Sequence, residues 1–365
     1  MQRVRSIDIM KGLLTLGMIF AHGIQILAYQ NSEGSLFRIF INRISFTGFC
    51  FCFGYVVNLA YYQNSVRYLQ RSIRTILRCY IAYVLSGYSY MVIMSSSPGL
   101  EVLLKIATFG WIPGYSEFLA TLTGLLLIAI ILKKVMLSIL DKPLLFFAVF
   151  FIILSSVFLP LHQYSIRIGL LIGNKSGTLF PILQYFPVFI LGCYFSTRKI
   201  TGIRTLSIFW IIALISFIFV LIDKNNIRRY PPNLVFIALS LGMSMFYYYI
   251  SLHLDKFLKN LTGELIIHFG NNVLYYLIIS NISFFILRKL ILKKSVLTIQ
   301  AFLIGLVVIL TGYYLQWIIR KPSKVRWEIK IQGIIIVNFM IQEYLLEEGF
   351  QFGVFNYYLE LAISE

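Results

Sequence analysis

Polar side chains recur along one apolar stretch near the N-terminus, and their types are those that move protons or bind anions. The stretch RSIDIMKGLLTLGMIFAHGIQILAY contains Asp8, Lys11, Thr15, His22 and Gln25, separated by three, four, seven and three residues. At about 100° per residue these positions fall on one face of a helix. A neutral imidazole can take a proton from a hydroxyl, which makes His22 a candidate general base. The alternative is a structural histidine that bonds to a neighbouring helix.

A second polar pattern is the row of arginines in RYLQRSIRTILRCY. Arg67, Arg71, Arg74 and Arg78 are separated by four, three and four residues, so they share one face of a helix. Arginine offers a rigid fork of donors that matches phosphate oxygens. A phosphate-bearing acyl donor such as coenzyme A is therefore a candidate ligand. The alternative is an anchor that faces lipid headgroups.

A few other residues could carry chemistry. Glu117 begins an apolar span and is a candidate for binding substrate in a pocket, with interfacial pairing as the alternative. The RRYPP run at 228–232 is a stiff basic turn that could also contact an acidic ligand. The four cysteines lack the spacing of zinc ligands, so we expect no metal. The sequence contains no Walker loop, GxGxxG or GxSxG motif.

The composition predicts the element type that must position these residues. The 365-residue chain is 59% hydrophobic and 13% charged, with a mean hydropathy of +0.83. Soluble domains are roughly 45–50% apolar and about 25% charged, so a lipid bilayer is the better environment for this chain. The formal net charge of +18 would suggest nucleic acid in a soluble protein. Here the cations lie mostly between apolar segments, so we expect no nucleic-acid partner.

The apolar segments predict an all-α membrane protein with about ten transmembrane helices. Only helices and closed barrels satisfy their backbone in lipid, and the segments lack the alternation of barrel strands. We expect one transmembrane domain over residues 1–330 and a C-terminal tail over 331–365. The expected spans lie at roughly 7–29, 39–62, 75–96, 115–132, 143–160, 181–197, 205–222, 233–252, 265–287 and 296–319.

The distribution of cations predicts the orientation of these spans. With the N-terminus in the cytoplasm, 19 of the 32 Lys and Arg residues lie inside and 12 lie outside. This excess favours a multi-pass protein of the cell membrane with both termini cytoplasmic. The N-terminus does not read as a cleavable signal peptide, because Asp8 and Lys11 interrupt its apolar region.

The first eighty residues resemble the membrane acyltransferase-3 family. The family opens with an Asp, then a basic residue followed by Gly, then a His eleven residues after the basic one, and here these are Asp8, Lys11, Gly12 and His22. The family usually has Arg in place of Lys11, and Lys keeps the charge without the two-pronged hydrogen bonding.

Later segments are similar to the same family. A Phe- and Gly-rich run near 51–55 precedes Arg71 and Arg74, which match its Arg-x-x-Arg motif, and Phe53 stands where the family has Ser. FGNNVLYYLII at 269–279 is similar to a family helix that ends in His, where this chain has Ile279.

The resemblance implies an acyltransferase that moves an acyl group from cytoplasmic acyl-coenzyme A to a sugar hydroxyl or amine. O-acetylation of a surface polysaccharide or lipid-linked sugar is the expected reaction. The resemblance makes His22 the expected base, assisted by Lys11 and Asp8, and Arg71, Arg74 and Arg78 the expected donor site.

Two alternatives remain open at this stage. One is a transporter or flippase of lipid-linked saccharides, which commonly shows repeated halves or broken helices; the sequence shows neither. The other is an inactive relative, because Lys11 and Ile279 depart from the family pattern. The oligomeric state does not follow from the sequence.

Overall fold

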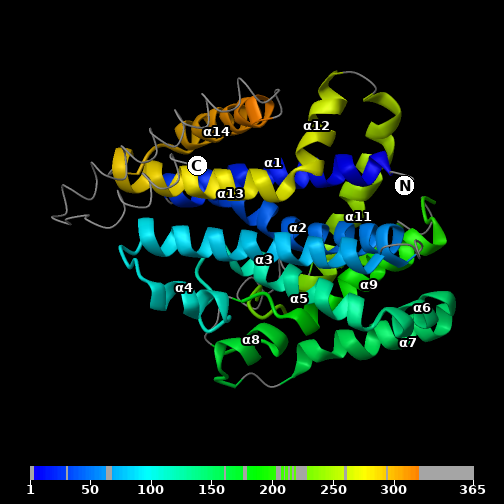
Figure 1. The fold of residues 1–365 in the computed structure, drawn as a ribbon. Coiled ribbons are helices and arrows are strands. Elements are labelled where there is room, and N and C mark those ends of the chain that lie inside the picture. Colours follow the sequence, from blue (N-terminus) through cyan, green and yellow to red (C-terminus); the bar gives the residue numbers. More distant parts are fainter. Residues whose placement is uncertain are drawn as a thin grey trace. The chain divides into compact units, whose positions relative to one another are not determined.

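All the regular elements that the structure describes are helices, which confirms the all-α prediction (Figure 1). The structure is a computed structural model. It describes residues 4–29, 32–62, 68–159, 162–175, 179–202, 228–258, 261–292 and 295–319, with short runs between 207 and 218. Most of the expected span 205–222, Arg67 and the tail 331–365 lie outside the described residues.

The chain divides into two compact units, residues 1–306 and 307–365. The first unit contains every helix up to α13 and the beginning of α14. The helices are α1 Arg5–Leu27, α2 Ser32–Val57, α3 Tyr68–Ile93, α4 Leu100–Ala107, α5 Glu117–Ile131, α6 Lys133–Asp141, α7 Pro143–Leu154, α8 Ile166–Ile172, α9 Ile182–Arg198, α11 Leu234–Phe257, α12 Leu261–Asn271, α13 Val273–Ile286 and α14 Thr298–Ile319.

Several of these helices are long and apolar enough to cross a membrane. Among the described residues five single helices qualify, or seven spans if each of two bent pairs counts as one. The polytopic membrane architecture is therefore confirmed, whereas the number ten is not. The expected spans at 143–160 and 181–197 correspond to the twelve-residue α7 and the seventeen-residue α9, both shorter than the roughly 20 residues that span a bilayer.

Close contact between α2 and α9 forms the centre of the first unit. A Cβ atom on Gly54 would overlap the carbonyl oxygen of Phe189, and one on Gly192 would overlap the carbonyl oxygen of Phe51. Each helix thus places a glycine where the other backbone passes. Small residues allow such an approach between membrane helices, where van der Waals packing replaces the hydrophobic drive of water.

The helix α1 is held against α12 in the same way. A Cβ atom on Gly12 would overlap the carbonyl oxygen of Ile266, and one on Gly270 would overlap that of Asp8. At the start of α1, the Nε atom of Arg5 lies 3.1 Å from an oxygen of Asp255 at the end of α11. The first turns of α1 are therefore fixed by both backbone contact and charge.

Two helix pairs are sharply bent, although no broken helix was expected from the sequence. The α12–α13 pair bends by 83° at Asn272, and the α5–α6 pair bends by 79° after Ile131. Gly and Asn form helix poorly, and the first bend follows Gly270 and Asn271. The side chain of Asn272 donates to the carbonyl of His268 at 2.7 Å, which satisfies one of the last carbonyls of α12.

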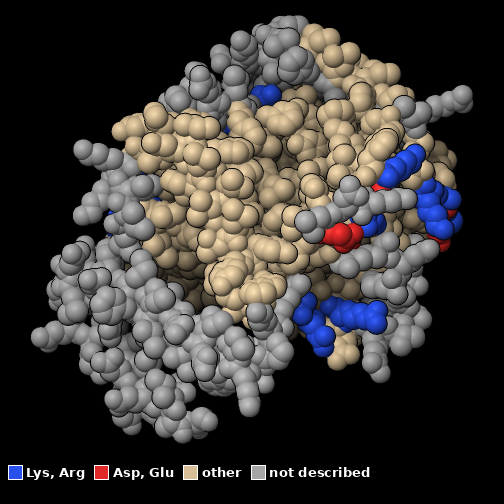
Figure 2. Space-filling view, turned by 90° about the horizontal axis from the view of Figure 1, so that it is seen from above, with Lys and Arg blue, Asp and Glu red and all other residues tan. Residues whose placement is uncertain are grey.

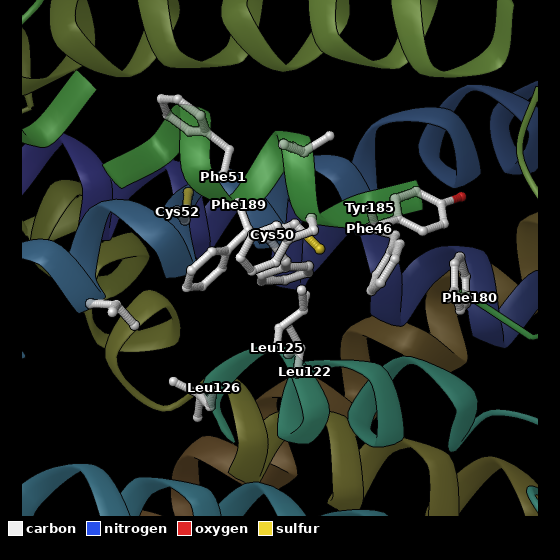
Figure 3. Close-up of a cluster of buried hydrophobic side chains, with 14 of the residues drawn as sticks. Phe46, Cys50, Phe51, Cys52, Leu122, Leu125, Leu126, Phe180, Tyr185 and Phe189 are labelled. Carbon is white, nitrogen blue, oxygen red and sulfur yellow. The ribbon is translucent and has the colours of Figure 1, made fainter. Parts of the chain in front are cut away.

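Apolar side chains fill the interior of the protein and also cover much of its described surface. Residues of α2, α5 and α9 gather in one buried apolar cluster that includes Phe46, Leu125 and Phe189 (Figure 3). Figure 2 shows one face on which uncharged side chains cover a broad area, while most of the visible charged side chains gather towards one edge. This distribution suits a protein whose sides contact lipid.

Candidate active site

A cavity of about 340 Å³ opens at the end of α1 away from its N-terminus. It lies between α1, α2, α3, α5 and α13, and the loops before α9 and α11 complete it. Its polar lining residues are His22, Gln25, Asn42, Ser45, Glu117, Arg229 and Asn281, and its aromatic ones are Phe46, Tyr90, Tyr115, Phe118, Phe180 and Tyr230. A pocket of 300–1,000 Å³ is typical of small-molecule sites.

The position of His22 is fixed by a hydrogen bond and a ring contact. Its Nδ1 atom lies 2.8 Å from Oδ1 of Asn281 on α13. Its ring meets that of Tyr115 edge to face, with centroids 5.1 Å apart and planes at 83°. Because His22 also lines the cavity, the imidazole is both held by the protein and available to a ligand.

Asn281 is itself held by neighbouring elements. Its Nδ2 atom donates to the carbonyl oxygen of Tyr115 and to Oγ of Ser86, each at 3.4 Å, and the residue is 2% exposed. Asn281 was not among the residues expected from the sequence, where Ile279, two positions earlier, stood out instead. A polar side chain in an apolar span is the signal that could have identified Asn281, because such groups are costly in a membrane.

Glu117 lines the cavity from the first position of α5, where the sequence interpretation expected it. A basic residue, Arg229, lines the same cavity. The Arg229 guanidinium carbon lies 4.9 Å from the ring centroids of both Phe180 and Tyr230, and its Nε atom has no hydrogen-bond partner among the described residues. Burial raises the pKa of Tyr230 to about 12, so this phenol keeps its proton at neutral pH.

Asp8 and Lys11 lie apart from this cavity. Their side chains form an ion pair of 2.6 Å within the first turns of α1, where both are largely buried. Lys11 is eleven residues before His22, which is about 16 Å along the helix axis. Neither residue is among those that line the cavity. The structure therefore places Glu117 and His22 in the lining of one cavity and leaves Asp8 and Lys11 outside it.

The expected donor-site arginines are exposed on α3. Arg71, Arg74 and Arg78 lie towards its N-terminal end, and the exposed apolar residues Ile81 and Leu85 continue the same three- and four-residue spacing. Tyr90, near the other end of α3, lines the cavity. Twelve to nineteen residues separate the three arginines from Tyr90, which is about 18–28 Å along the axis.

The described residues contain no group of three His, Cys, Asp or Glu side chains that is placed to hold a metal ion. All four cysteines are buried and unbridged. The chemistry that the cavity offers is therefore that of its imidazole, its carboxylate, its guanidinium and its uncharged polar groups.

Comparison with known proteins gives one match. The model of the acyltransferase-3 family, described as an acyltransferase domain, matches residues 4–315. No curated protein and no solved structure matches the chain. The family match covers every residue of the cavity and confirms the resemblance seen in the first helices and near residue 270.

Proposed function

The chain belongs to the membrane acyltransferase-3 family, and on that premise we propose that it moves an acyl group from acyl-coenzyme A to a hydroxyl of a cell-surface polysaccharide or lipid-linked sugar. Acetyl is the proposed acyl group. The observation that carries this proposal is the position of His22, which is held by Asn281 and lines a cavity of small-molecule size.

The proposed reaction uses His22 as general base and then as general acid. The Nε2 atom of His22 takes the proton of the acceptor hydroxyl while the oxygen attacks the thioester carbonyl carbon. The new carbon–oxygen bond forms, the carbon–sulfur bond breaks, and the imidazolium returns the proton to the leaving thiolate. The products are an ester and free coenzyme A. A positioned base contributes about 10²–10⁴-fold to such a step.

The cavity lining supports a sugar as the acceptor. Aromatic rings such as Tyr90 and Phe180 offer flat apolar faces, whereas Asn42, Ser45 and Glu117 offer hydrogen-bonding groups. Few precisely placed polar groups on an apolar background are typical of ligand pockets. In the proposed complex Glu117 accepts a hydrogen bond from an acceptor hydroxyl.

The donor is proposed to bind with its phosphates against Arg71, Arg74 and Arg78. Guanidinium groups pair well with phosphate oxygens, and these three are exposed at one end of α3. In this arrangement the donor must extend about 18–28 Å along the axis of α3, from its phosphates at the arginines to its acyl group at the level of Tyr90. Lys11 and Asp8 lie on α1 about 16 and 21 Å before His22 along the helix axis, and they are proposed to orient the donor's arm.

The proposed location is the cell membrane, with both termini in the cytoplasm. The excess of Lys and Arg on that side supports this orientation. The arginines of α3 would then face the cytoplasmic donor, and the cavity beside His22 would receive its acceptor from the outer half of the membrane.

A flippase or transporter of lipid-linked saccharides is the second candidate, favoured by the two bent helix pairs. Broken helices near a central site are common in transporters. The two candidates differ in their need for His22 as a base, because transport breaks no covalent bond.

The decisive experiment uses the purified full-length protein in lipid vesicles with radiolabelled acetyl-coenzyme A and lipid-linked oligosaccharide extracted from the host cells. Wild type is expected to label the oligosaccharide. The His22→Gln variant, at matched protein level, is expected to label it about 10²–10⁴-fold more slowly. Equal labelling by both proteins would overturn the mechanism. If wild type moves unlabelled oligosaccharide across the vesicle membrane and acylates none of it, the acyltransferase proposal is overturned in favour of transport.

A further inference from the structure

The geometry points to Asn281 as the residue that sets the tautomer of His22, leaving the Nε2 atom of the imidazole without a proton and available to the cavity. Asn281 is thus a positioning residue, and its catalytic value rests on the proposed function. The assignment of the tautomer does not depend on the proposed function, since it follows from the hydrogen bonds within the protein.

The orientation of the Asn281 amide follows from its neighbours. One end of the amide lies 3.4 Å from the carbonyl oxygen of Tyr115. A carbonyl oxygen accepts hydrogen bonds and donates none, so the atom that faces it must be the NH₂ group. The Oγ atom of Ser86, also 3.4 Å from this group, is free to accept a second hydrogen bond. The opposite orientation would place two acceptor oxygens against each other.

The fixed amide then determines the protonation of the ring. The carbonyl oxygen of Asn281 lies 2.8 Å from Nδ1 of His22, and since this oxygen only accepts, Nδ1 must carry a proton. A neutral imidazole carries one N–H, so Nε2 keeps its lone pair. Within the described part of the chain His22 makes no other hydrogen bond.

The amide differs in one respect from the carboxylate that often orients a catalytic histidine. A carboxylate in that place fixes the tautomer and also stabilises the imidazolium. Asn281 fixes the tautomer without adding a negative charge. The edge-to-face contact with Tyr115 opposes rotation of the ring, so the same nitrogen continues to face the cavity.

The first test reads the tautomer directly in the full-length protein, labelled with ¹⁵N-histidine and reconstituted in lipid. The chain contains four histidines, and His22→Gln assigns the signal of His22. We expect a protonated Nδ1 and an unprotonated Nε2 in wild type, and a mixture of both tautomers in Asn281→Leu. A protonated Nε2 in wild type would overturn the inference whether or not the variant folds.

The second test measures activity, with three variants of α13. Asn281→Leu should lower the acyl-transfer rate by on the order of 10²-fold. Asn281→Asp should keep most of the rate at high pH, and the acid limb of its pH–rate profile should move to higher pH, because a carboxylate favours the imidazolium. Ser280→Ala is the matched control, since Ser280 is the buried neighbour whose hydroxyl bonds to the carbonyl of Leu277.

The outcomes of the two tests separate the inference from the proposed function. An unchanged pH–rate profile in Asn281→Asp, with wild-type activity, would overturn the role of Asn281. If wild type transfers no acyl group at all, the proposed function fails, and the ¹⁵N measurement still decides whether Asn281 sets the tautomer.

Discussion

Glu117 and Arg229, one acidic and one basic residue, line the same cavity, although they come from the start of α5 and from the loop before α11. Arg229 rests against two aromatic rings, and Glu117 occupies the first position of its helix. Both therefore lie where a ligand in the cavity would contact them. This arrangement makes the cavity, and not the buried ion pair of Asp8 and Lys11, the place to test acceptor binding.

Glu117→Gln is expected to weaken acceptor binding without affecting the donor. Loss of a hydrogen bond to a charged group costs about 1.5–3 kcal/mol, so the KM for the acceptor should rise by about 10-fold or more. Steady-state kinetics with varied acceptor and fixed acyl-coenzyme A measures this change. The matched control is Glu101→Gln, since Glu101 is an exposed acid that pairs with Lys105 on α4. Equal effects of the two substitutions would count against a role for Glu117 in binding.

Arg71→Ala combined with Arg74→Ala is expected to raise the KM for acyl-coenzyme A, because two guanidinium groups would be lost from the phosphates. The expected loss is again about 1.5–3 kcal/mol for each charged hydrogen bond. Binding of coenzyme A to the purified protein, measured by calorimetry, checks this result. Lys134→Ala serves as control, because Lys134 is an exposed cation near the start of α6. Wild-type affinity in the double variant would identify the arginines as lipid-facing anchors.

A reporter fused after Glu365 is expected to behave as a cytoplasmic protein. The excess of Lys and Arg predicts that both termini lie inside, which requires an even number of crossings. Paired fusions of an enzyme active only in the cytoplasm and one active only outside measure the location. If only the enzyme that works outside the cell is active, the number of crossings must be odd.

Gly192→Ala is expected to destabilise the protein, because its Cβ would overlap the backbone of Phe51. Overpacking typically costs about 1–3 kcal/mol, and a clash with backbone cannot be relieved by turning a side chain. Gly202→Ala is the matched control, since a Cβ on Gly202 has no atom within 4 Å. Thermal unfolding in detergent should show a lower midpoint for Gly192→Ala alone. Identical midpoints would argue against the close contact of α2 and α9.

The sequence was sufficient to predict the helical membrane fold and to single out His22, which the structure places in the cavity. Long apolar segments leave the backbone few alternatives in lipid, and the spacing from Lys11 to His22 is visible within one helix. The bends after Ile131 and at Asn272 were missed, because short polar interruptions also occur in straight helices. Hydropathy alone does not distinguish the two cases.

The partners of His22 could not be predicted, because they come from distant parts of the chain. Asn281 and Tyr115 approach His22 only after α13 and the loop before α5 pack against α1. Arg229 was recognised as part of a basic turn, but its place in the cavity depends on where that turn packs. Contacts of this kind follow from tertiary packing, which a single sequence does not reveal.

The bend at Asn272 gives α1 two fixed points that belong to one continuous segment. Gly270, before the bend, touches the backbone of Asp8, and Asn281, after it, bonds to His22. The eleven residues from Gly270 to Asn281 therefore contact α1 at two points, Asp8 and His22, which are fourteen residues apart. The length of this segment determines whether both contacts can form together. Inserting one residue into α13 before Asn281 would turn that amide by about 100° around its helix. The imidazole would then lose its partner even though both helices remained intact.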